Sequence, residues 1–170
     1  ANERRSWQIY HEVALTLIHR ARTLYRDNKL LQELESAVYA FDSTMIELCL
    51  GLFPWARAAG HVKTSAAVKL HTLLDLQAKI PTFIRVSAAN VHDMLILDEL
   101  VYEPGAFYVL DRGYLDFARL RRIDDSKAFF VIRAKQALRF VRLSSHPVNK
   151  ATGVMVDQTI RLTVWRTHQA

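Results

Sequence analysis

The stretch Tyr39-Ala40-Phe41-Asp42-Ser43-Thr44 decides the fold, together with its counterpart Tyr108-Val109-Leu110-Asp111-Arg112-Gly113-Tyr114. In each, a run of apolar, β-branched or aromatic residues ends in an aspartate, and such a run is typical of a strand buried on both faces. A carboxylate at the tip of a buried strand caps the next turn, binds a cation or takes part in chemistry. Because two such aspartates each lead into a polar or glycine-containing turn, we predict a shared metal site at Asp42 and Asp111.

Length and composition are those of an ordinary globular domain. The chain has 170 residues, 51% apolar and 24% charged, which suits one domain with a sizeable core and argues against global disorder. No apolar run reaches the roughly 18 residues that span a bilayer, and the first five residues lack the apolar core of a signal peptide. We therefore expect a cytoplasmic protein. The single cysteine, Cys49, excludes an internal disulfide and is expected to be a buried small hydrophobe.

Positive charge is concentrated in the last third of the chain. Residues 112–170 carry 12 Lys and Arg against 4 Asp and Glu, whereas residues 1–111 carry 11 against 13. This asymmetry favours a polyanionic partner such as nucleic acid. A solvated basic surface without a partner is the alternative that charge alone leaves open.

Periodicity predicts the order of the elements. An amphipathic helix over residues 7–25 is followed by a strand over 34–42, an apolar stretch over 45–53 that fits either a helix or a strand, and a loop through Pro54, Gly60 and Ser65. Two strands over residues 67–76 and 80–88 then form a hairpin, and a helix over 90–100 begins with Asn90 as its cap. A strand over 106–111, a helix over 115–123 and a strand over 128–134 come next. Two arginine-rich strands over 138–143 and 154–165 end the chain.

Three consecutive strands followed by two that return through helices match the α/β fold of ribonuclease H-like proteins. In that fold a mixed five-stranded sheet is flanked by helices, and its first and fourth strands lie side by side in the centre. Asp42 and Asp111 would then project into one cleft. We predict a ribonuclease H-like core over residues 1–135 and the beginning of a basic, β-rich insertion over residues 136–170.

Several blocks of this sequence, in the same order, resemble the DDE transposases of the IS4 family of bacterial insertion sequences. They are the two stretches quoted first together with Leu52-Phe53-Pro54-Trp55, Val68-Lys69-Leu70-His71-Thr72-Leu73-Leu74-Asp75-Leu76, Ile80-Pro81-Thr82-Phe83-Ile84, His92-Asp93 and Leu115-Asp116-Phe117. The resemblance covers the chain from about Asn2 onward.

The resemblance implies a catalytic core in which two aspartates and a glutamate hold Mg²⁺ or Mn²⁺ for DNA cleavage and strand transfer. Asp42 and Asp111 match the two aspartates. The partners implied are double-stranded DNA, at the insertion-sequence ends and the target, and a second copy of the chain in a homodimeric DNA complex. The family's glutamate lies in a tyrosine–arginine–glutamate–lysine signature, which this chain lacks, because no Glu follows Glu103. The N-terminal DNA-binding region of such proteins is also expected to be missing or reduced here.

Phosphodiester cleavage in such a site uses two metal ions roughly 3.5–4 Å apart, and a shared carboxylate sets that spacing. Asp42 is our choice for the bridging ligand and Asp111 for a ligand of one ion, with a role as turn caps as the alternative. For His92 and Asp93 we expect helix capping, with substrate contact as the alternative. We expect a structural role for His71 and turn or helix-surface roles for Asp75 and Asp116.

Basic side chains are the candidates for DNA contact. Arg112 lies beside Asp111 and is suited to a phosphate or to an acidic neighbour. A DNA-facing ribbon is predicted from Lys135, Arg139, Arg142, Arg161 and Arg166, with a solvated surface as the alternative. Two functions remain open from the sequence. One is a transposase catalytic domain, and the other is a truncated, catalytically inactive DNA-binding remnant or inhibitor that lacks the third carboxylate.

Overall fold

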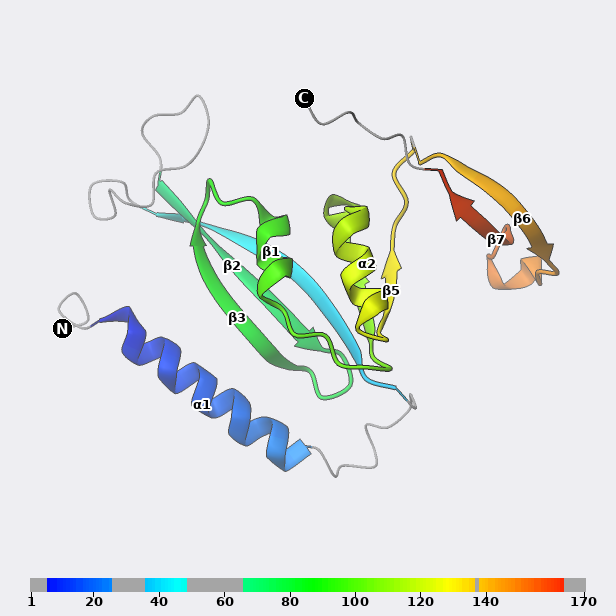
Figure 1. The fold of residues 1–170 in the computed structure, drawn as a ribbon. Helices are drawn as coiled ribbons and strands as arrows, with labels where there is room; N and C mark the ends of the chain where they lie inside the picture. The colour runs from blue at the N-terminus through cyan, green and yellow to red at the C-terminus, as the bar shows by residue number, and fades with distance from the viewer. Residues whose placement is uncertain (1–5, 26–35, 49–65, 137, 164–170) are drawn as a thin grey trace. The chain divides into compact units, whose positions relative to one another are not determined.

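The computed structural model describes residues 6–25, 36–48, 66–136 and 138–163 (Figure 1). The chain divides into two compact units, Ala1–Arg133 and Ala134–Ala170. Among the described residues, no helix is both long enough and apolar enough to cross a membrane.

The first unit is built on a mixed five-stranded sheet in the order β3-β2-β1-β4-β5. Antiparallel pairing joins β1 to β2 and β2 to β3, and parallel pairing joins β1 to β4 and β4 to β5. The strands are β1 (Val38–Leu48), β2 (Ala66–Asp75), β3 (Ile80–Ala88), β4 (Phe107–Leu110) and β5 (Phe129–Ile132). This sheet confirms the predicted α/β fold, and the first and fourth strands are neighbours at its centre as expected.

Strand β1 is longer than predicted. Its expected end at Asp42 is wrong, because the strand continues to Leu48 and Asp42 is its fifth residue. Pairing with β2 explains the difference, since that ladder runs without a break from Tyr39↔Asp75 to Leu48↔Ala66. The ambiguous stretch 45–53 is therefore strand as far as residue 48. Residues 34, 35 and 49–65, which include Cys49 and the predicted loop, lie outside the described residues.

Helices connect and flank the strands. The predicted first helix is confirmed as α1 (Trp7–Tyr25), which runs alongside β3 (Figure 1). The predicted helix over 90–100 is instead a 3₁₀ helix, η4 (Asp93–Glu99), and its N-cap is His92 rather than Asn90. The chain first turns after β3, where the Val91 amide bonds to the Ala88 carbonyl, so helical geometry begins later. A 3₁₀ turn, η5 (Arg112–Tyr114), and α2 (Phe117–Asp125) replace the helix expected over 115–123.

The two faces of the sheet are covered unequally. One face, which we call the closed face, packs under η4 and α2, and its buried residues include Tyr39, Phe41, Tyr108 and Leu110 from the strands and Ile96, Leu97, Leu120 and Ile123 from the helices. Because side chains alternate along a strand, the residues between these point to the opposite face. This open face carries Ala40, Asp42, Phe107, Val109, Phe129 and Val131, and Phe129 and Val131 are 54% and 53% exposed.

The second unit is an antiparallel hairpin of β6 (Phe140–His146) and β7 (Asp157–Leu162), with a 3₁₀ turn, η6 (Lys150–Thr152), in the connection. Both strands are shorter or shifted relative to the predicted ranges 138–143 and 154–165, and residues 164–165 lie outside the described part. Gly153 follows η6 with φ of 83°, a left-handed conformation that favours glycine. The strands of this hairpin are almost entirely exposed.

Candidate functional site

The two predicted aspartates follow one register pair at the centre of the sheet. Phe41 of β1 and Leu110 of β4 are the last paired residues of this parallel ladder, and Asp42 and Asp111 come directly after them. From the central strands β1 and β4, the sheet extends to one side through β2 and β3 and to the other through β5. The two aspartates therefore lie where the strand order reverses, at the carboxyl ends of the parallel strands. Ligands of open α/β sheets bind at such a point.

The surroundings of the two carboxylates differ from the sequence prediction. Both aspartates are exposed, and the strands that lead to them are fully buried on one face rather than on both. Asp42 remains in β1, where it lies opposite Thr72 of β2, whereas Asp111 leaves the sheet and is the N-cap of η5 without a side-chain cap bond. Both side chains are accessible to a solute.

Asp111 is ionised and held by a neighbouring arginine. The Arg133 Nη2 atom lies 3.1 Å from Asp111 Oδ1. The backbone amide of Arg112, together with the charge of Arg133, lowers the pKa of Asp111 below its ordinary value. An anionic, oxygen-only donor pair suits a hard cation such as Mg²⁺ or Mn²⁺. Within the described residues no group of three or more His, Cys, Asp or Glu side chains able to hold a metal is found.

Tyr114 lies on the closed face, behind the two aspartates. Its side chain is buried, and its ring meets the Phe41 ring edge-on with centroids 5.2 Å apart. Burial raises the pKa of the Tyr114 phenol, a hydrogen bond with Ser43 lowers it, and the carboxylates Asp93, Asp42 and Asp111 add to the rise. The phenol is therefore neutral and lies within electrostatic reach of three carboxylates.

His71 and Asp93 form a second polar cluster on the closed face. His71 is fully buried, its Nε2 atom lies 2.8 Å from Ser87 Oγ, and burial lowers its pKa. Asp93 is paired with Lys69, whose Nζ atom lies 2.9 Å from Asp93 Oδ1, and His71 Nδ1 lies 3.9 Å from the same oxygen. A neutral histidine and an already paired carboxylate fit the structural role that the sequence favours for His71.

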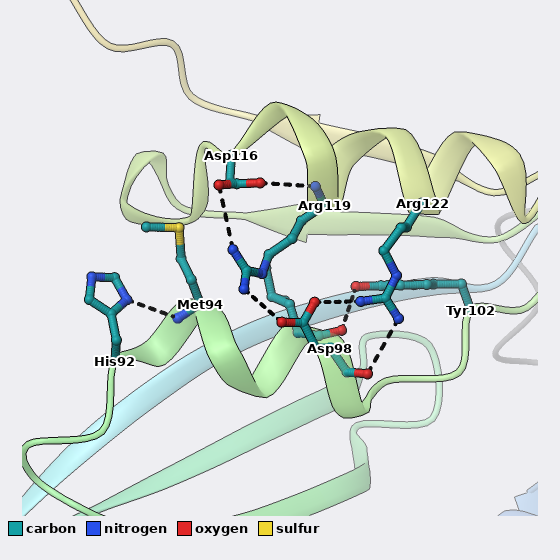
Figure 2. Close-up of polar contacts among 8 residues, drawn as sticks. His92, Met94, Asp98, Tyr102, Asp116, Arg119 and Arg122 are labelled. Carbon is teal, nitrogen blue, oxygen red and sulfur yellow. Dashed lines mark hydrogen bonds and ion pairs between the residues drawn. The ribbon is translucent and has the colours of Figure 1, made fainter. Parts of the chain in front are cut away.

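Ion pairs fasten η4 to α2 on the closed face. Figure 2 shows Asp98 of η4 between Arg119 and Arg122 of α2, and the Arg119 Nη2 atom lies 2.6 Å from Asp98 Oδ2. Asp116 caps α2 by accepting a bond from the Arg119 amide, and His92 caps η4 by accepting one from the Met94 amide. These contacts account for His92 and Asp116 as capping residues. Asp75 likewise accepts the amides of Gln77 and Ala78 in the turn after β2.

Comparison with known proteins identifies the family. Residues 33–167 match the model of a family described as the transposase DDE domain. The chain belongs to this family. In a similar protein of Sinorhizobium fredii (strain NBRC 101917 / NGR234), described as "Putative transposase y4zB", 140 residues align with 32% identity. That alignment covers 80% of this chain and 38% of the relative, so the chain spans well under half of the relative's length.

The predicted DNA-contact residues of this transposase domain do not all share one surface. Arg112 is exposed in η5, next to Asp111. Lys135, Arg139, Arg142 and Arg161 are exposed in the second unit, and Arg166 lies outside the described residues. In the hairpin Arg142 is opposite Ile160 while Arg161 is opposite Val141, so these two arginines are on opposite faces. A single ribbon facing DNA includes one of them, not both.

Three residues around the aspartates were missed by sequence reasoning. Arg133 follows β5 and reaches Asp111 only because β5 is placed beside β4. Ser43 and Tyr114 belong to the quoted stretches, yet their contact depends on η5 folding back onto the closed face. The alternation of buried and exposed positions along β1 was the available signal for Ser43, since it shares a face with Phe41.

Proposed function

We propose that this domain carries out metal-dependent DNA strand cleavage and strand transfer at the ends of an insertion sequence, as an IS4-type DDE transposase. The observation that carries the proposal is the register of β1 and β4, in which Asp42 and Asp111 both follow the pair Phe41↔Leu110. Membership of the transposase DDE domain family supports the proposal, because a carboxylate pair at this point of the sheet is consistent with a transposase function.

Asp42 and Asp111 would hold the divalent cation, Mg²⁺ or Mn²⁺, with Asp42 as the ligand that two ions share. When bound, the cation supplies an activated water and stabilisation of the departing oxygen. Asp111 enters this role already ionised, since its pKa is lowered. Arg133 forms an exposed ion pair with Asp111 and can turn to a phosphate, because its guanidinium matches phosphate geometry.

A nicking assay tests this function. DNA containing an insertion-sequence end is incubated with Mg²⁺ or Mn²⁺ and the 170-residue chain, its Asp42→Ala variant, or a version extended to the next in-frame helix that contains a glutamate. Two aspartates leave a second ion without a third carboxylate, so we expect cleavage from the extended version and its loss in the extended Asp42→Ala variant. Cleavage that persists in that variant would refute the proposed site.

The second unit is proposed as the part of the β-rich insertion that contacts the DNA backbone, while residues 1–135 form the catalytic core. Its arginines are exposed, and residues 112–170 carry a net charge of +8. Each phosphate contact contributes about 0.9 to the slope of log affinity against log salt. Arg142→Ala and Arg161→Ala should therefore have different effects on this slope. Only replacement of the arginine on the DNA-facing side should lower it, by roughly 0.9.

Arg20→Ala on α1 is the matched control, because it removes the same charge from the first unit and should leave the slope unchanged. If neither hairpin arginine alters the slope, the hairpin does not contact the backbone. A binding module without cleavage remains the second candidate function, supported by the same basic hairpin. It is the correct one if the extended version binds DNA with a steep salt dependence but does not cut it.

A further inference from the structure

We propose that His71 and Asp93 form a proton-dependent latch between β2 and the start of η4, in which His71 donates its Nδ1 proton to Asp93 and takes up a second proton at Nε2. Both side chains lie on the closed face, His71 within β2 and Asp93 at the first position of η4. The inference goes beyond the proposed function, because the latch needs neither metal nor DNA.

Two buried polar atoms on the closed face have no hydrogen-bond partner within the described residues. They are His71 Nδ1 and Asp93 Oδ1, which lie 3.9 Å apart, just beyond the range of a hydrogen bond. His71 is fully buried, so bulk water does not reach its ring. The Lys69 Nζ atom lies 2.9 Å from Asp93 Oδ1, and this ion pair indicates that the carboxylate carries its charge. Buried polar atoms without partners are costly, and here one atom is suited to donate and the other to accept.

The charge of Asp93 decides which nitrogen of the neutral imidazole carries the proton. A proton on Nε2 would leave the Nδ1 lone pair of His71 facing a carboxylate oxygen at 3.9 Å, and the two negative atoms would repel each other in buried surroundings. A proton on Nδ1 replaces that lone pair with a donor. Nε2 then accepts a hydrogen bond from the Ser87 hydroxyl, whose Oγ atom lies 2.8 Å away. The geometry therefore selects the Nδ1–H form, and a small approach of η4 completes the bond to Asp93.

Ser87 allows His71 to take up a second proton without losing a hydrogen bond. Its Oγ atom also lies 3.3 Å from the Ala88 carbonyl oxygen, so its hydroxyl can donate to that oxygen instead of to the ring. The Ser87 oxygen then accepts from Nε2–H, while Nδ1–H still faces Asp93. Hydrogen bonds between charged groups are shorter and stronger than those between neutral groups. Proton uptake should therefore draw the start of η4 toward β2.

The charged groups around His71 set the pH at which the latch tightens. Burial is the strongest influence and lowers the pKa of His71 below its ordinary value of 6.5. Two carboxylates of η4 oppose this fall and two cations of the strands add to it, namely Asp93 and Glu99 against Lys69 of β2 and Arg85 of β3. From β1 the neighbour is the uncharged Phe41 ring, which stacks on the imidazole with an interplanar angle of 9°. The latch therefore tightens below pH 6.5 rather than at neutral pH.

The two ends of η4 are held by different contacts. Near its end, Asp98 pairs with arginines of α2, whereas Asp93 at its start is paired with Lys69 of β2. The Leu95 amide donates to the His92 carbonyl over 3.0 Å, so the exchange of this amide reports on the first turn of η4. A tighter latch should slow that exchange.

Nitrogen-15 NMR of the full chain tests the latch, because a ring nitrogen has different chemical shifts with and without its proton. The His71 ring signals are assigned through their correlation with the backbone and are followed from about pH 8 to about pH 5. Exchange of the Leu95 amide is measured over the same range and corrected for its intrinsic pH dependence. Asp93→Asn removes the charge of the acceptor at nearly unchanged size. Asp98→Asn is the matched control, since it removes one carboxylate from the same helix, where that carboxylate pairs with α2 instead of β2.

We expect the unaltered chain to carry the His71 proton on Nδ1 at about pH 8 and to show slower Leu95 exchange once the second proton is bound. Asp93→Asn should weaken proton binding by His71 about tenfold, as expected for the loss of a nearby opposite charge, and should abolish the slowing. Asp98→Asn should leave the tautomer and the proton affinity unchanged. A neutral His71 with its proton on Nε2 in the unaltered chain would overturn the latch without any variant. Unchanged proton affinity in Asp93→Asn would overturn it equally.

Discussion

The closed and open faces of the sheet use their side chains in opposite ways. On the closed face, apolar residues are buried under η4 and α2, and polar groups such as Asp98 and His71 have partners within the domain. On the open face, Asp42 and Asp111 are exposed beside apolar residues that are about half exposed. Stability is therefore concentrated on the closed face, and the exposed carboxylates that we propose as metal ligands lie on the open one.

The largest difference between the faces is expected for substitutions in the apolar layers. Ile123→Ala should lower the free energy of unfolding by about 2–5 kcal/mol, because Ile123 is fully buried and a cavity would remain. Val131→Ala on the open face should lower it by less than about 1 kcal/mol, since that side chain is already half exposed. Urea denaturation of both variants makes the comparison, and equal losses would contradict the distinction between the faces.

The ion pairs of Asp98 should give a smaller effect that depends on pH. The hydrogen bond from Arg119 lowers the pKa of Asp98, so the stabilisation is present above the unfolded pKa of about 3.9 and is lost as pH falls through the folded pKa. Asp98→Asn should thus lower the free energy of unfolding by about 1 kcal/mol at pH 7, a value limited by solvent screening of this partly exposed group. Near pH 3 the difference from wild type should shrink.

Asp124→Asn is the control for that measurement. Asp124 is well exposed and meets Arg121 only at 4.0 Å, so its replacement should leave the unfolding curve at pH 7 almost unchanged. An equal loss in both variants would mean that general surface charge, rather than the contact between η4 and α2, stabilises the closed face.

The sequence was informative wherever local pattern and pairing agree. Alternation and turn residues predicted β3 at its observed bounds, and the run that ends at Asp111 predicted β4 and its place beside β1. The strand order could also be predicted, because two strands that return through helices pair in parallel with their neighbours. That order also predicted that Asp42 and Asp111 lie on neighbouring strands, and both come directly after the register pair Phe41↔Leu110.

Sequence patterns gave wrong boundaries for strands and helices where tertiary pairing overrides local signals. The polar pair Asp42-Ser43 looked like the end of a strand, yet β2 pairs with β1 beyond it and keeps the chain extended. Asn90 is a good capping residue, but the turn after β3 delays the helix until His92. Arg133 is 22 residues from Asp111, so only the position of β5 reveals their ion pair. The contact between the Tyr114 and Phe41 rings likewise depends on η5 folding back onto the closed face, which the spacing of residues in the sequence does not specify.

On the open face, removal of the central carboxylate should separate stability from function. Asp42→Ala should change the free energy of unfolding by no more than about 0.5 kcal/mol, because the side chain is exposed and aspartate is a poor strand former. The same variant should lose its Mn²⁺-dependent signal broadening near Asp111. Thermal unfolding and a metal titration on one sample provide the measurement. A loss of more than about 1 kcal/mol would show that Asp42 supports the sheet.

The smallest expected effect concerns Arg133, whose guanidinium occupies one oxygen of Asp111. Arg133→Ala removes both a competing partner and a positive charge, so Mn²⁺ affinity should rise by roughly two- to fivefold, as expected for an exposed ion pair. Arg133→Lys keeps the positive charge but lacks the planar guanidinium, so its Mn²⁺ affinity should lie between those of the wild-type chain and the Arg133→Ala variant. Arg121→Ala, which removes an exposed arginine paired with Asp125 on α2, should leave the affinity unchanged. If Arg133→Ala instead weakens Mn²⁺ binding, Arg133 orients Asp111 for the cation rather than competing with it, and the open face is more ordered than its exposure indicates.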